Sequence, residues 1–86
     1  MRQLEKIYKA LANRRRLAII KYLKDAKEAP VTEIAKFLKI SFKSTSKHLA
    51  VLAAADILEK EQRSLQAYYY LPARPAPPLK HLLSII

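Results

Sequence analysis

Four lysines and no acidic residue lie between Glu33 and Asp56, and they give the clearest chemical signal in the chain. They are Lys36, Lys39, Lys43 and Lys47, and Ser46 lies next to the last of them. Lysine can donate hydrogen bonds to guanine or phosphate oxygens, and serine can contact either. This segment therefore has the chemistry of a nucleic-acid-binding surface. The alternative is a solvated lysine face on an ordinary helix.

The chain offers little material for catalysis or metal binding. It has no cysteine, no glycine and two histidines, His48 and His81. No Ser-His-Asp set, paired carboxylates or glycine-rich phosphate loop can be assembled from these residues. We expect His48 to form a local hydrogen bond or contact phosphate, and His81 has no carboxylate nearby with which to bind zinc. The sequence therefore predicts a binding protein rather than an enzyme, without a metal or cofactor.

The charge balance also favours a polyanionic partner. The formal net charge is +10, from 17 Lys and Arg against 7 Asp and Glu. Nucleic acid is the first candidate and an anionic membrane surface the second. No apolar run approaches the roughly 20 residues that cross a bilayer, and residues 1–6 do not lead into a signal peptide. We therefore expect a cytoplasmic protein that does not bind a membrane.

Helical spacing of apolar residues predicts three helices in the first half of the chain. The first is indicated by Leu4, Ile7, Tyr8 and Leu11. Asn13 is placed to cap a second helix, and Thr32 to cap a third that starts at Glu33. Arg14 to Arg16 lie where cations oppose the dipole of the second helix, so they form either a solvated face or a phosphate contact.

The lysine-rich segment falls on a predicted helix-turn-helix. Lys39-Ile40-Ser41 forms a tight turn, and Ser41 is placed to cap a helix from about Phe42 to Ala55. On this helix the core face is predicted to hold Thr45, Leu49 and Leu52. The outward face then consists of Phe42, Lys43, Ser46, Lys47 and Ala50. Such a helix is a natural candidate for insertion into the major groove of DNA.

The pattern changes to strands after Asp56. Ile57 to Gln62 and Ala67 to Leu71 predict a two-stranded hairpin with a polar turn at Arg63 and Ser64. Alternation puts Tyr69 with Leu71 on one face and Tyr68 with Tyr70 on the other, which favours hairpin packing over stacking on single-stranded bases.

The element order predicts a mostly α fold with a small β-hairpin, namely a winged helix-turn-helix with a three-helix core, a wing and terminal helices. Residues 1–71 form the predicted DNA-binding domain. Residues 72–78 form a proline-rich linker, and residues 79–86 a C-terminal helix.

A family resemblance adds to this pattern. Over residues 8 to 71 the chain resembles the ArsR family of bacterial and archaeal repressors. The resemblance is carried by the stretch VTEIAKFLKISFKSTSKHLAVLAAADIL, by KALANRRRLAIIKYL before it and by the hairpin ending YYYL. The resemblance implies a homodimer whose recognition helices enter successive major grooves of double-stranded DNA and whose wings reach the flanking backbone. The implied DNA-binding residues are Ser41, Phe42, Lys43, Ser44, Ser46, Lys47 and His48 on the helix, and Arg63, Ser64 and Gln66 on the wing.

The same resemblance implies that the first and last helices build the dimer. The candidate residues are Leu4, Ile7, Leu11, Leu79, Leu82, Leu83 and Ile86. The chain departs from the family in two respects. Asp56 stands where glycine is common, so the helix end and the wing turn must use other residues. The cysteines with which many members sense metal are absent, so metal sensing is not expected.

We therefore predict a sequence-specific, homodimeric transcriptional regulator, most simply a repressor, for which the sequence identifies no effector. Two alternatives stay open, because winged helices also serve as protein-interaction adaptors and as non-specific nucleic-acid-binding proteins.

Overall fold

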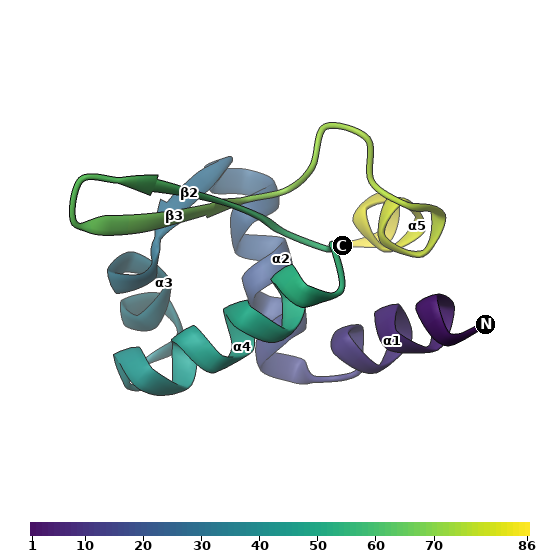
Figure 1. Ribbon diagram of the computed structural model, residues 1–86, viewed down its shortest axis with the longest axis horizontal. Helices are drawn as coiled ribbons and strands as arrows, with labels where there is room; N and C mark the ends of the chain where they lie inside the picture. Colours follow the sequence, from purple (N-terminus) through teal and green to yellow (C-terminus); the bar gives the residue numbers. More distant parts are fainter.

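The computed structural model describes all 86 residues. The chain forms five helices and a small sheet, whose hairpin projects away from the two terminal helices (Figure 1). The mostly helical winged helix-turn-helix predicted from the sequence is confirmed. The elements in chain order are α1 (Arg2–Leu11), α2 (Arg14–Ala26), β1 (Glu28–Pro30), α3 (Val31–Leu38), α4 (Phe42–Ala54), β2 (Glu59–Arg63), β3 (Gln66–Tyr70) and α5 (Pro77–Ile85).

Asn13 separates α1 from α2 and begins the second helix. Helix α1 ends at Leu11, and the side chain of Asn13 accepts hydrogen bonds from the backbone amides of Arg15 and Arg16. These amides have no partner within the helix, so the side-chain oxygen satisfies them. The predicted cap at Asn13 is confirmed.

The start of α3 differs from the prediction. Pro30 occupies the N-cap position and the helix begins at Val31, whereas Thr32 was expected to be the cap. A proline needs no hydrogen bond for its nitrogen and has a fixed φ that suits the entry to a helix. The Thr32 hydroxyl donates instead to Oε1 of Gln66, at 3.2 Å.

A tight turn joins α3 to α4 without glycine. Lys39 adopts the left-handed conformation (φ 59°) and its amide bonds back to α3. Ser41 then caps α4, because its hydroxyl accepts from the amide of Ser44 at 3.0 Å. The Thr45 hydroxyl donates to the carbonyl of Ser41 at 2.9 Å. The predicted turn and cap are both confirmed, and together they fix the angle at which α4 leaves the core.

The sheet has three strands rather than the two predicted. The strand order is β1-β3-β2, and all pairs are antiparallel. Glu28 pairs with Tyr70 and Pro30 with Tyr68, so the short segment before α3 completes the sheet. The sequence does not predict this strand, because three residues show no strand periodicity.

The hairpin is also shifted from its predicted position. Ile57 and Leu58 are buried and precede β2, while Arg63 ends that strand and pairs with Gln66. The turn therefore consists of Ser64 and Leu65, and Ser64 has a positive φ of 56°. Asp56 likewise adopts φ 58° at the end of α4, where a glycine would be expected.

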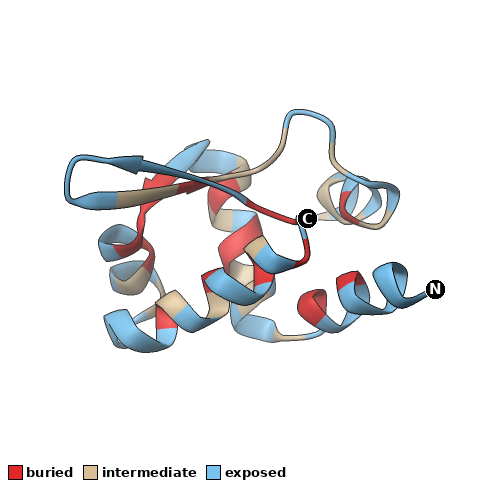
Figure 2. Cartoon of the chain, viewed as in Figure 1, coloured by how far each residue is buried: buried red, intermediate tan, exposed pale blue.

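The core lies where α2, α3, α4 and the sheet meet (Figure 2). Its fully buried side chains include Ile19, Ile20, Leu23, Ile34, Leu49, Leu52 and Ile57. The wing tip and the outer turns of the helices are exposed. This distribution makes α4 a rigid support, since its inner face is held by the core along most of its length.

Helix α5 packs against the body of the chain instead of extending from it. It begins at Pro77, so two residues of the predicted linker belong to its first turn, where proline is favoured. Leu79 is 1% exposed and belongs to the main core. The Lys24 ammonium donates to the carbonyls of Leu83 and Ile86, at 2.7 and 3.1 Å, and so holds the end of α5 against α2.

Candidate nucleic-acid interface

Helix α4 presents a polar and basic face to solvent. The buried residues Thr45, Leu49 and Leu52 fix its rotation about its own axis, as the sequence predicted. Ser41, Phe42, Lys43, Ser44, Lys47 and Ala50 are consequently exposed, while Ser46 and His48 are partly buried. The structure thus brings the predicted recognition residues together on one helix and its cap.

The lysines of α4 and of the preceding helix and turn are not neutralised. The two ion pairs in the structure both involve Arg63, which lies on the wing. Lys36, Lys39, Lys43 and Lys47 therefore have no carboxylate partner within 4.0 Å. Unpaired cations on a folded surface attract a polyanion and can be held close to its phosphates.

His48 is tied to the beginning of α2. One terminal nitrogen of Arg16 lies 3.3 Å from Nδ1 of His48. A guanidinium can only donate, so Nδ1 accepts and the proton of the neutral ring is on Nε2. Burial lowers the pKa of His48, and the charges of Arg16 and Arg15 lower it further. His48 is therefore held neutral, with one N–H donor left for another partner.

Arg16 also closes the end of α1. Its Nε donates to the carbonyl of Ala10 at 2.6 Å, and its other terminal nitrogen donates to the carbonyl of Lys9 at 3.3 Å. One guanidinium thus joins α1, α2 and the candidate recognition helix. From the sequence, Arg16 was expected either to lie on a solvated face or to contact a phosphate. The charge placed against the helix dipole was a signal that it had a specific task.

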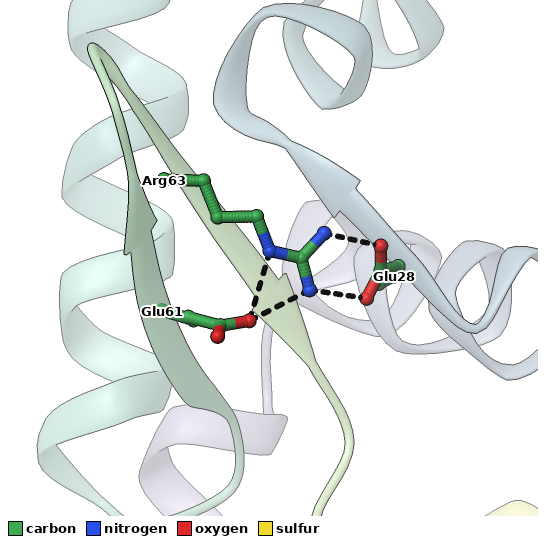
Figure 3. A network of polar contacts seen from close by, with 3 residues as sticks. All are labelled: Glu28, Glu61 and Arg63. Carbon is green, nitrogen blue, oxygen red and sulfur yellow. Dashed lines mark hydrogen bonds and ion pairs between the residues drawn. The ribbon is translucent and has the colours of Figure 1, made fainter.

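The wing is held by a network around Arg63 (Figure 3). Its guanidinium donates to both carboxylate oxygens of Glu28 at 2.6 and 2.8 Å, and to Glu61 at 2.6 and 2.9 Å. It also lies 4.4 Å above the ring of Tyr68. The hydrogen bond from Arg63 lowers the pKa of Glu28, and the two carboxylates raise the pKa of Arg63. Arg63 and the two carboxylates are exposed, and the network links the wing to β1.

Leu65 and Gln66 of the wing line a groove beside α4. Leu65 at the turn is 95% exposed, and Ser64 is exposed beside it. Gln66, Leu65 and Phe42 line a groove of about 190 Å³ between the wing and the start of α4. Of the three predicted wing residues, Ser64 and Gln66 are exposed, and Oε1 of Gln66 accepts a hydrogen bond from Thr32, whereas Arg63 would have to exchange its carboxylates for a phosphate.

An apolar groove lies between α1 and α5, which are adjacent in Figure 1. It has a volume of about 800 Å³ and is lined by Leu4, Ile7, Tyr8, Leu11, Leu17, Leu82 and Ile85, among others. Tyr8 is 56% exposed, although its neighbours in the groove are apolar. Among the residues proposed for dimer contact, Leu79 lies in the chain's own core, and Leu83 and Ile86 hold the hydrogen bonds from Lys24.

The structure gathers no group of three or more His, Cys, Asp or Glu side chains that could hold a metal ion. None of its helices has the length and apolar character needed to span a membrane.

Comparisons with known proteins agree with this architecture. The model of a helix-turn-helix domain family matches residues 11–61, which is more than half of the 86-residue chain. No curated protein sequence matches the chain.

Several solved structures share the fold. HlyU from Vibrio cholerae N16961 superposes with a TM-score of 0.82 at 28% identity, over 96% of this chain and 86% of that one. The Mycobacterium bovis protein Mb0332, described as a homodimeric winged helix-turn-helix DNA-binding domain and a possible ArsR-family regulator, gives 0.81 at 26% identity, over 96% and 73%.

The transcriptional repressor PagR of Bacillus anthracis shares the fold at 24% identity, with a TM-score of 0.80 over 98% of this chain and 92% of that one. The family match, the winged architecture and the lysine-bearing helix agree with one another. The chain therefore belongs to the helix-turn-helix domain family and is an ArsR-type winged helix-turn-helix transcriptional regulator without the metal-binding cysteines.

Proposed function

We propose that the protein is a homodimer that represses transcription by binding a pseudo-palindromic DNA operator, with α4 in the major groove. The observation that carries this proposal is the outward face of α4, where Lys43, Ser46 and Lys47 stand on a helix whose inner face is fixed by the core. Lysine and serine at such positions can contact base edges and phosphates. Such contacts give DNA binding, for which no cofactor is needed.

The dimer is proposed from the apolar groove between α1 and α5. Leu4, Tyr8, Leu17 and Ile85 leave large apolar side chains exposed along it. A contiguous exposed apolar surface with a polar surround is typical of a protein-protein interface. The homodimeric state of Mb0332 supports the same arrangement here. We place a second copy of the chain on this groove, with Leu4, Tyr8, Leu82 and Ile85 in direct contact.

The dimer geometry sets an expectation for the operator. Two recognition helices related by a two-fold axis bind half-sites about 34 Å apart, which is one turn of DNA. His48 is proposed to donate from Nε2 to a phosphate, because Arg16 occupies its other nitrogen. Ser64 and Gln66 at the wing are proposed to contact the backbone beside the half-site.

Selection from a pool of genomic duplex fragments tests this function. The purified protein is mixed with the pool, bound fragments are recovered in the presence of excess random duplex, and the recovered DNA is sequenced. Enrichment of an inverted repeat with about 10 base pairs between half-site centres supports the proposal. Equal recovery of all fragments would favour non-specific binding, and no recovery would favour an adaptor that binds protein.

A further inference from the structure

A second basic surface lies between α1 and the C-terminal half of α4. It is a cleft of about 480 Å³ whose charged lining residues are Arg2, Lys6, Lys9, Arg16 and Glu5. Four cations against one carboxylate leave this cleft with a formal charge of +3. No carboxylate lies within 4.0 Å of these cations, since both ion pairs of the structure are on the wing. The cleft therefore combines concave shape with unneutralised positive charge.

Helix α1 separates this cleft from the apolar groove. Arg2, Lys6 and Lys9 follow one another at spacings of four and three residues, so they share one face of the helix. Leu4, Tyr8 and Leu11 lie on the other side and line the groove proposed for the second copy. A partner on the apolar face therefore leaves the basic face available.

The cleft continues the outward face of α4. Val51 and Ala54 form its floor on that helix. They follow Lys47 and Ala50 at four-residue spacing, and Val51 is 41% exposed. The surface that carries the recognition residues at one end of α4 therefore leads into the basic cleft at the other end.

The length of α4 can be compared with the width of the major groove of DNA. The 13 residues of α4 span about 20 Å at a rise of 1.5 Å per residue. The major groove is about 12 Å wide. When α4 crosses the groove with its first turns on base edges, its last turns lie at the sugar-phosphate backbone that borders the groove.

We infer that the cleft between α1 and α4 binds the phosphodiester backbone bordering each half-site, with Lys6 and Lys9 contacting phosphates. This inference rests on the proposed function and names two contact residues that the helix-turn-helix itself does not contain. Arg16 acts there as a positioning residue. Its bonds to the carbonyls of Lys9 and Ala10 and its contact with His48 hold α1 at a fixed place beside α4.

Salt dependence of binding tests the inference. The double variant Lys6→Gln/Lys9→Gln is compared with Lys21→Gln/Lys27→Gln, which removes the same charge from exposed lysines outside the cleft. Each phosphate contact contributes about 0.9 to the slope of log affinity against log salt. Losing two contacts in each protomer of a dimer should make the slope shallower by about 3.6. Over a fourfold change in salt, that difference amounts to about 150-fold in affinity.

The control variant is expected to keep nearly the wild-type slope. Both variants should keep the wild-type preference for operator over random duplex, because phosphate contacts carry no base sequence. Glu5→Gln should raise affinity by removing the one carboxylate from the cleft. Equal slopes in the two double variants would overturn the inference, as would a Glu5→Gln protein with unchanged affinity. Failure of the wild type to prefer operator would instead contradict the proposed function.

Discussion

Arg16 at the start of α2 contacts His48 in the middle of α4, with 3.3 Å between a guanidinium nitrogen and Nδ1 of the ring. The same guanidinium bonds to the carbonyls of Lys9 and Ala10. The helix proposed to contact the second copy and the helix proposed to contact DNA are therefore joined through one side chain. Any shift of α1 against α4 must break at least one of these bonds.

His48 gives the chain a pH-dependent stability. Its pKa is lowered in the folded state, chiefly by burial, from a usual value of 6.5. As the pH falls below that value, the unfolded chain takes up a proton that the folded chain resists, so the free energy of unfolding decreases. We expect His48→Gln to reduce this loss between pH 7 and pH 5, as measured by urea denaturation. An unchanged pH dependence in the variant would contradict the role of His48.

Lys27 tests the cost of a positive φ at a residue other than glycine. It has φ 76° and ψ −47° at the end of α2, a region that is unfavourable for a residue with a side chain. Lys27→Gly should raise the free energy of unfolding by about 1 kcal/mol. The same substitution at Lys21, which is exposed within α2, should lower it by about 1 kcal/mol. Thermal denaturation of the two variants would show shifts of opposite sign, and a loss of stability in both would refute the argument.

Asn13 should account for much of the stability of the start of α2. Asn13→Ala removes the acceptor for the amides of Arg15 and Arg16 and should cost about 1 kcal/mol. Asn13→Asp keeps an acceptor at the same place and serves as the matched control. Chemical denaturation of both variants checks the prediction, which fails if alanine and aspartate are equivalent.

The apolar groove predicts the effect of a single charge on assembly. Tyr8→Glu places a carboxylate where we expect the second copy to pack, and burying an unpaired charge is strongly unfavourable. Sedimentation should then show a monomer, and operator affinity should fall because the two half-sites are no longer linked. Leu65→Glu is the control for the sedimentation measurement, because this exposed residue lies at the wing turn, outside the groove. A dimeric Tyr8→Glu protein would exclude the groove as the interface.

Local chemistry made parts of the interface predictable. Asn13 and Ser41 could be recognised as caps because their side chains act on amides two or three residues away. The outward face of α4 followed from helical periodicity, since Thr45, Leu49 and Leu52 are the residues that the core buries. These features depend on neighbours in the sequence, so the sequence contains enough information to place them.

Features formed by distant segments were not predictable in the same way. The pairing of Glu28 with Tyr70 completes the sheet, and it also brings the Glu28 carboxylate to Arg63. The cap of α3 was predicted wrongly at Thr32, because the helix already begins at Val31, after Pro30. The Thr32 hydroxyl donates to the side chain of Gln66 instead. The two prolines that open α5 were assigned to a linker, although proline at the first positions of a helix is a recognised signal.

The central claim is that the outward face of α4 reads base sequence, and Lys47 tests it most directly. Wild type, Lys47→Ala and the control Lys21→Ala are titrated against the selected operator and against random duplex at one salt concentration. We predict that Lys47→Ala lowers the preference for operator by about 30-fold or more, because each of the two protomers loses one base contact of about 1–3 kcal/mol, while Lys21→Ala changes nothing. An operator preference unchanged by Lys47→Ala would contradict the assignment.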